Sequence, residues 1–316
     1  MVKKSRPSGS CETLCLIYKN DKMKNLIQTL LFTILVFATS NVFGQKTNIS
    51  EPVDSTKIYK IKLKDGIIFI GNILQQDSVN IVLRTSSIPK IEIPVSKIKS
   101  IDKVDKSNFK DGSYWYPNPH ATRYFYGPSA IGLKKGEGYY QNTYLVLNSF
   151  NVGITDNISI GGGLELISTF AGRDPIFFIT PKVSFKVAEK FHAGGGVLYA
   201  RIPGGFGSLG TVYATGTYGT TDNNITGSLG WGFVDSEFSE RPIITLSGMT
   251  RISKRAALVT ENWLIPTDGY YGLFSYGVRF FGEKIAVDLA FINNRDIAEE
   301  IIIGIPYVSF TVKFGK

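Results

Sequence analysis

The sequence predicts an all-β fold: a small β-barrel-like domain followed by an antiparallel, up-and-down transmembrane β-barrel of about twelve strands. The first observation behind this prediction is the hydrophobic alternation of the segments between Tyr139 and Phe314, which very short turns separate. The second is that apolar and polar faces match across these turns, and the third is that tight and longer turns alternate. Together these features predict one continuous antiparallel meander.

Two pairs of residues illustrate the matched faces. Folding the chain at the tight turns sets Val152 opposite Ile160 and Lys186 opposite His192. Because side chains alternate between the two faces of a strand, a wrong register would mix apolar with polar positions. A meander that is apolar on one face, and glycine-rich or polar on the other, is typical of a closed barrel in a lipid bilayer.

Composition and charge exclude some classes of protein. The 316 residues include 35 basic and 26 acidic residues, for a net charge of +9. Part of this excess falls within residues 1–24, and the rest is spread without a basic stripe, so we expect no nucleic-acid partner. A mean hydropathy of +0.04 excludes a helical membrane protein with many spans, but it suits a barrel in which only alternate residues face lipid.

The N-terminal region is expected to be removed. Lys24, the apolar run from Leu26 to Ala38 and the compact residues before Gln45 describe a signal peptide over residues 23–44, cleaved near Gly44/Gln45. The alternative is a membrane-anchoring helix, although about 20 apolar residues are needed to span a bilayer. Residues 1–22 are then an upstream extension that is not native.

Cysteine usage agrees with export. Cys11 and Cys15 both lie in the removed region, so the mature chain would have no cysteine. A chain exported without disulfides or free thiols suits the bacterial envelope. No cluster of histidines accompanies the two cysteines, and we expect no metal site.

The exported part is predicted to contain four regions. Residues 45–56 are a polar spacer, 57–105 a small β-domain, 106–121 a linker rich in proline and aromatic residues, and 122–316 the barrel. The string LKDGIIFIGNILQQDSVNIVLRT, followed by IEIPVSKIKSI, resembles Sm-like or SH3-like small β-barrels. The RNA role of Sm-like proteins is not expected here, because an exported chain seldom meets RNA and paired base-stacking aromatics are missing from this segment.

The barrel region is divided into twelve expected strands. Its last segment alternates up to Phe314, and it resembles the closing strand of bacterial outer-membrane barrels. The whole layout resembles that of bacterial outer-membrane β-barrel proteins. The expected strands are Arg123–Leu133, Tyr139–Ile154, Ile158–Thr169, Ile176–Val187, Phe191–Ile202, Ser208–Thr220, Ile225–Val234, Pro242–Ile252, Ala256–Ile265, Tyr270–Phe281, Lys284–Ile292 and Ile301–Phe314.

The turns predict the orientation of the barrel. Short turns face the periplasm and longer loops face outward in bacterial outer-membrane barrels. An even number of strands places both ends of the chain on the side of the short turns. We therefore expect the small domain in the periplasm, where a protein could be its partner, and the barrel in contact with outer-membrane lipid.

Alternation assigns polar residues to the lumen and aromatic residues to the membrane interface. Arg279 and Asp288 are expected to lie diagonally across the turn at Gly282-Glu283. Lumen charges either pair and fill the barrel, or stay hydrated and line a pore. The lumen candidates are Glu165, Lys182, Lys186, His192, Arg251, Arg279 and Asp288, and the interface aromatics are Tyr139, Tyr140, Trp231, Trp263, Tyr270 and Tyr271.

Catalysis is not the favoured interpretation. Residues 205–210 satisfy G-x-G-x-x-G, but no βαβ unit surrounds them, so we expect no dinucleotide and no other cofactor. A lipid-modifying enzyme would need a base such as His192 beside a serine and an acid. The hypotheses are thus a porin-like channel or a membrane anchor that presents the small domain, with two alternatives: an integral membrane enzyme using His192, and a soluble, secreted lipocalin-like barrel.

Overall fold

The computed structural model describes residues 54, 56–104, 108–110, 113–171, 174–204 and 207–315. The predicted upstream extension, the signal peptide with its cleavage site and nearly all of the spacer lie outside the described residues. The chain divides into two compact units at the boundary between Val104 and Asp105. The smaller and the larger unit are described in turn.

The small unit is a five-stranded antiparallel sheet with the strand order β4-β3-β2-β1-β5. Register shifts in β2 and between β1 and β5 bend the sheet, because a bulge increases local twist. A short 3-10 helix, η1, joins the last two strands. The elements are β1 (Ile58–Leu63), β2 (Ile68–Gln76), β3 (Asn80–Thr85), β4 (Ile91–Pro94), η1 (Val95–Lys97) and β5 (Ile98–Val104).

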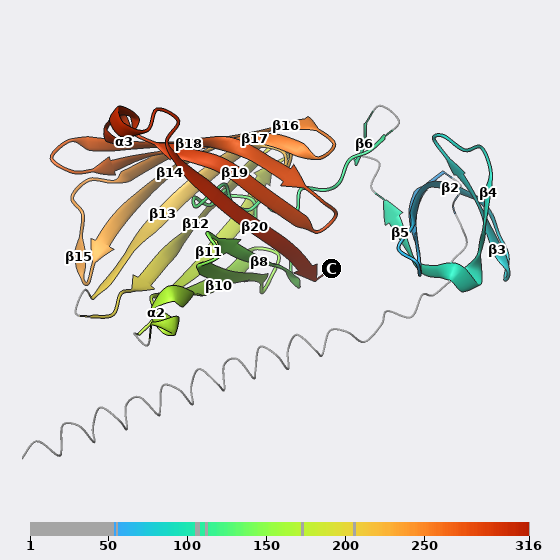
Figure 1. The fold of residues 1–316 in the computed structure, drawn as a ribbon, viewed down its shortest axis with the longest axis horizontal. Coiled ribbons are helices and arrows are strands. Elements are labelled where there is room, and N and C mark those ends of the chain that lie inside the picture. The colour runs from blue at the N-terminus through green and yellow to red at the C-terminus, as the bar shows by residue number, and fades with distance from the viewer. Residues whose placement is uncertain are drawn as a thin grey trace, which may run out of the picture. The chain divides into compact units, whose positions relative to one another are not determined.

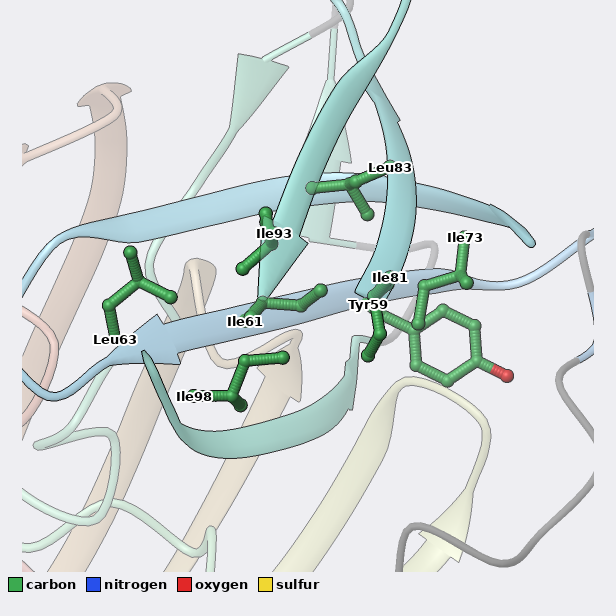
Figure 2. Packing of buried hydrophobic residues seen from close by; sticks show 8 residues of the cluster. All are labelled: Tyr59, Ile61, Leu63, Ile73, Ile81, Leu83, Ile93 and Ile98. Carbon is green, nitrogen blue, oxygen red and sulfur yellow. The ribbon is translucent and has the colours of Figure 1, made fainter. Parts of the chain in front are cut away.

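Alternation in these strands builds a single apolar core. Tyr59, Ile61 and Leu63 point to the same side of β1, and residues from the other four strands meet them, as Figure 2 shows. Ile61 is completely buried. In the turn between β2 and β3, the Asp77 carboxylate accepts hydrogen bonds from two backbone N–H groups, and these bonds hold its pKa below the usual value. The unit is a separate all-β domain, as predicted.

The large unit contains a closed antiparallel barrel of twelve strands. Each strand pairs with its neighbour in sequence, and β20 pairs with β8 to close the ring, so β8 and β20 lie side by side in Figure 1. The strands are β8 (Glu137–Thr143), β9 (Leu147–Gly153), β10 (Ile158–Glu165), β11 (Phe177–Ala188), β12 (Phe191–Arg201), β13 (Ser208–Gly219), β14 (Asn223–Val234), β16 (Ile243–Ser253), β17 (Ala256–Pro266), β18 (Tyr270–Phe281), β19 (Ile285–Asn293) and β20 (Ile305–Gly315).

Small elements accompany the barrel. A two-residue strand, β15 (Glu237–Phe238), folds back on the end of β14. Helices α2 (Leu166–Phe170) and α3 (Arg295–Glu300) lie in loops, and β6 (Phe109–Lys110) pairs with β7 (Ser113–Tyr114) before the barrel. Among the described residues, no helix is long and apolar enough to span a bilayer.

The predicted registers are correct at the turns that define them. Val152 pairs with Ile160, and Lys186 pairs with His192. The five tight connections, at residues 154–157, 189–190, 220–222, 254–255 and 282–284, all lie at one end of the barrel, here called the turn end. Because β8 starts beside the end of β9, and β20 ends beside the start of β8, both termini of the barrel are also at the turn end.

Two strand predictions were wrong. One expected strand is really two and another is not in the barrel, so the total is still twelve. The expected strand Tyr139–Ile154 is split into β8 and β9 by a turn at Tyr144 and Leu145, which both have positive φ angles, of 56° and 63°. This turn lacks the glycine or asparagine that usually marks such a conformation. The expected first strand, Arg123–Leu133, is not a strand of the barrel at all, because it enters the lumen.

Candidate functional site: a segment that fills the barrel lumen

Residues 118–133, called the lumen segment below, fold back on themselves inside the barrel. Arg123 and Pro128 form an isolated antiparallel bridge, and the Tyr124 N–H donates to the Gly127 carbonyl at 2.9 Å. The tip of this hairpin is therefore at residues 125–126. The Tyr124 hydroxyl and the carbonyls of Tyr124 and Phe125 bond to residues on the inner faces of β14, β18 and β20, so the segment occupies the interior that a pore would need.

Glu261 of β17 holds the tip of the lumen segment. Its carboxylate is completely buried, and Oε2 accepts from the backbone N–H groups of three consecutive residues, 125–127, at 2.8, 3.0 and 2.9 Å. The indole N–H of Trp263 donates to Oε1 at 2.7 Å. A buried carboxylate is tolerated when several donors satisfy it, and charge-assisted bonds of this type are strong. Glu261 thus fixes the backbone of the hairpin tip.

Arg279 of β18 holds the carbonyl groups of the same segment. Its guanidinium makes a bidentate ion pair with Asp288 of β19, with N–O distances of 2.6 and 3.0 Å. It also donates to the carbonyls of His120, Arg123 and Tyr124 at 2.7, 3.1 and 2.8 Å. Five bonds exhaust the donor capacity of an arginine. The barrel wall therefore provides a carboxylate that accepts from the N–H groups of the segment and a guanidinium that donates to its carbonyls.

Hydroxyl and ring contacts complete the attachment around the barrel. Tyr307 of β20 donates to the carbonyl of Phe125 at 3.0 Å, and their rings pack at 5.2 Å. On the opposite wall, Thr217 of β13 accepts from the Ala130 N–H at 2.7 Å, and the Tyr124 hydroxyl hydrogen-bonds to Thr226 of β14 at 2.7 Å. Contacts on several strands make the segment an integral part of the core.

Two of the predicted lumen residues also contact this region. Lys182 of β11 donates to the carbonyl of Ile131 at 2.8 Å and to that of Thr122 at 3.3 Å. Arg251 of β16 is buried at the turn end, pairs with Asp222 at 2.8 Å and lies 5.3 Å from the Trp115 ring. The linker that precedes the lumen segment thus places Trp115 against a lumen arginine.

The remaining lumen candidates lie apart from this network. The Glu165 carboxylate turns to the N–H groups of Ile167 and Ser168, where it caps α2. Lys186 is exposed, and the Nδ1 atom of His192 is buried with no hydrogen-bond partner. The structure brings together Lys182, Arg279 and Asp288 around the lumen segment and leaves Glu165, Lys186 and His192 outside.

Arg279 and Asp288 differ from prediction in one detail. They are directly opposite each other in the register of β18 and β19, and not diagonal, because Phe280 pairs with Val287. The register of these two strands is therefore shifted by two residues from the expected one, in which Phe280 faced Ile285.

The aromatic candidates divide between the two faces of the barrel. Trp231, Tyr270 and Tyr271 are exposed, and Tyr140 packs against the outward-facing Phe150. Tyr139 and Trp263 do not fit the expectation of interface residues. Tyr139 is buried with its ring 4.8 Å from that of His120, and Trp263 is on the inner face with Glu261. Strand parity sets both side chains on the inner face, because Trp263 is two residues from Glu261 and Tyr139 is next to the outward-facing Tyr140.

Glu261 and Thr217 also hold the lumen segment, and the sequence prediction missed both of them. Alternation with the outward Leu258 and Leu264 sets Glu261 on the inner face, so parity alone could have found it. No comparable signal identifies the lumen segment, since its partners are far away in sequence.

The outer face of the barrel is largely apolar. This is the inverse of a soluble barrel, in which the apolar face is the interior, and it contradicts the lipocalin-like alternative. Exposed apolar side chains on the strands include Ile158, Ile160, Ile179, Val183, Phe185, Val212, Leu229, Trp231, Leu246, Leu258, Leu264, Phe274, Phe280, Leu289 and Val308.

The fold and the interior together define the class of this protein as a closed, twelve-stranded antiparallel β-barrel with a polar, filled lumen. Within the described ranges, no group of His, Cys, Asp and Glu residues is arranged to hold a metal ion.

Comparisons with known proteins give only distant likenesses. No family model and no curated sequence matches the chain, whereas 15 chains of known structure do. A KdgM porin has 9% identity and a TM-score of 0.40, over 56% of this chain and 96% of its own. The outer-membrane expressed OmpT of Vibrio cholerae has 14% identity and a TM-score of 0.26, over 81% and 93%. At these TM-scores the likeness assigns no function or ligand to this chain.

Proposed function

We propose that this protein is an outer-membrane β-barrel that its own lumen segment closes, and that it serves as a membrane anchor for the small β-domain. The observation that carries the proposal is the attachment of the lumen segment to Glu261 and Arg279. A pore requires a hydrated path, whereas these buried side chains bond to protein backbone. Of the two alternatives for lumen charges, pairing and filling is the better supported.

The apolar outer face supports the location in a membrane. Exposing so many neighbouring apolar side chains to water would cost free energy, whereas exposing them to lipid would not. Export across the inner membrane, which the N-terminal sequence predicts, leaves the outer membrane as the destination for a barrel of this type. The soluble form would have to cover this face in another way.

Connectivity supports a periplasmic position for the small domain. The barrel begins and ends at the turn end, and short turns face the periplasm in bacterial barrels. The chain reaches the lumen from Trp115, which contacts Arg251 at the same end. The small domain precedes this point, so it would be on the periplasmic side, where a protein could bind it.

An enzymatic role for His192 receives less support. In a Ser-His-acid triad, Nδ1 of the histidine donates to the acid. Here Nδ1 of His192 has no hydrogen-bond partner, and the residue opposite is Lys186. We therefore do not include catalysis in the proposal.

Two measurements on the full chain test the proposal. Cell fractionation with gel electrophoresis, before and after boiling, should place the protein in the outer membrane and show a heat-dependent change in mobility. A soluble protein without such a change would refute the membrane barrel. In planar bilayers, the purified protein should show no steady conductance, and a stable open channel would refute the closed lumen.

A matched variant makes the conductance result interpretable. Replacing residues 119–132 with a Gly-Ser linker removes the bonds that Glu261 and Arg279 make to the lumen segment but keeps the connection to β8. If this variant still shows the heat-dependent mobility change, it should conduct ions. If neither the wild type nor this variant conducts ions, another part of the barrel must close it.

A further inference from the structure

A small cavity lies between the lumen segment and the inner face of the barrel, and we infer that it binds a monovalent anion of the size of chloride. The cavity has a volume of about 20 Å³. Two cationic side chains line it, Arg123 from the lumen segment and Lys182 from β11. The cavity is separate from the Glu261 and Arg279 attachments.

The charges around this cavity are not balanced by protein carboxylates. Among the described residues, neither Arg123 nor Lys182 forms an ion pair. The two fully buried acids are committed elsewhere: Glu261 bonds to backbone N–H groups and Trp263, and Asp288 bonds to Arg279 and Ser309. No acid lines the cavity. Two cations that share a poorly hydrated space repel each other, and an anion between them would remove that repulsion.

Three side chains that line the cavity have N–H donors without an acceptor. Two of the three Lys182 protons have carbonyl acceptors, which leaves one donor. Arg123 has a single long bond of 3.5 Å to Gln141, although a guanidinium can donate five. Asn151 is 7% exposed, lines the cavity, and has a buried Nδ2 atom without a hydrogen-bond partner. Unused donors of three side chains thus converge with the positive charge.

The size of the cavity defines the class of ligand. A space of roughly 10–15 Å³ for the centre of a sphere is enough for one water molecule. The observed volume is of this order, so a halide ion fits, whereas a sugar, a peptide or a phosphate ester does not. The chemistry selects for negative charge, since a water molecule would supply only a dipole between the two cations.

Binding at this place would reinforce the lumen segment. Lys182 holds both arms of the hairpin through the carbonyls of Thr122 and Ile131, and Arg123 is part of the hairpin itself. An anion bound to both side chains joins the segment to β11 by a third connection. We therefore expect the folded barrel to be more stable in chloride than in a salt of a large anion.

The direct experiment is anomalous diffraction from crystals of the full chain grown in sodium bromide. One bromide peak per barrel, in contact with Arg123 and Lys182, is the expected result. In Lys182→Gln, which keeps a donor for the carbonyls, the peak should be lost. Lys186→Gln is the matched control, because Lys186 is on the same face of the same strand but does not line the cavity. The bromide peak should persist in Lys186→Gln.

A second measurement does not depend on crystals. The unfolding temperature of the wild type should be higher in sodium chloride than in sodium gluconate at equal concentration, and this shift should vanish in Lys182→Gln and in Arg123→Gln. Absence of the bromide peak in the wild type, together with equal unfolding temperatures in the two salts, would show that the cavity holds water alone and overturn the inference. Both outcomes are independent of whether the barrel conducts.

Discussion

Arg279 and Asp288 face each other across β18 and β19 and form a bidentate ion pair that is completely shielded from solvent, with at most 1% of either side chain exposed. Two N–H groups of Arg279 make the ion pair, and the other three donate to carbonyl groups of the lumen segment. One arginine therefore connects two neighbouring strands and the contents of the barrel.

Conservative replacement of Arg279 should destabilise the barrel. Arg279→Lys keeps the charge beside Asp288 but cannot supply the fork of donors, so we expect a loss of about 3 kcal/mol in the free energy of unfolding. Urea unfolding in detergent, followed by gel mobility, measures this loss. The double variant with Asp288→Asn should lose less than the sum of the single variants, because the two residues act together.

The pair Lys313–Glu137 provides a control for Arg279. It also joins two strands of the barrel, at 2.8 Å, but both of its side chains are partly exposed. Lys313→Gln should therefore cost no more than about 1 kcal/mol. Equal losses from the two substitutions would contradict the special role of Arg279.

Removal of the Glu261 carboxylate should loosen the lumen segment. Glu261→Ala leaves three backbone N–H groups and the Trp263 indole without their acceptor, which we expect to cost about 3 kcal/mol or more. Amide hydrogen exchange of residues 125–127 should increase, and intermittent conductance should appear in planar bilayers. Glu237→Ala, at an exposed carboxylate in β15, is the control and should change neither. Unchanged exchange in Glu261→Ala would argue against its role as the anchor of the tip.

Leu145 offers a stabilising substitution. Its backbone has a φ of 63°, which costs a non-glycine residue roughly 1 kcal/mol, and its side chain is 79% exposed. Leu145→Gly should raise the temperature at which the heat-dependent mobility change occurs. Leu145→Val should lower it, because a β-branched residue tolerates positive φ poorly. The same direction of change in both variants would show that backbone strain is not the cause.

The small domain should respond to core changes independently of the barrel. Ile61→Ala removes a completely buried side chain and should cost about 2–5 kcal/mol of small-domain stability. Ile67→Ala makes the same substitution at a side chain that is 51% exposed, and it should cost far less. Limited proteolysis of the full chain can follow cleavage within residues 57–104. A simultaneous shift in barrel unfolding would show that the two units are not independent.

The barrel was predictable where local rules suffice. Lys186 and His192 were correctly paired because the turn beside them is short and side chains alternate strictly, so one register alone keeps like faces together. The turn at Tyr144 and Leu145 was missed because neither residue carries a turn signal. Arg279 and Asp288 were recognised as neighbours, although a register error of two residues made them diagonal.

The sequence by itself determined the class of the fold, the apolar outer face and the polar inner face, because these depend on alternation over a few residues. The tertiary structure alone decided what fills the lumen. Tyr124 and its neighbours form a segment that looks like a further strand, and its true position depends on Glu261 and Arg279, which are 134 to 159 residues away. Those partners lie on β17 and β18, far along the meander from the segment, and no local pattern in the chain shows that the segment lies against them.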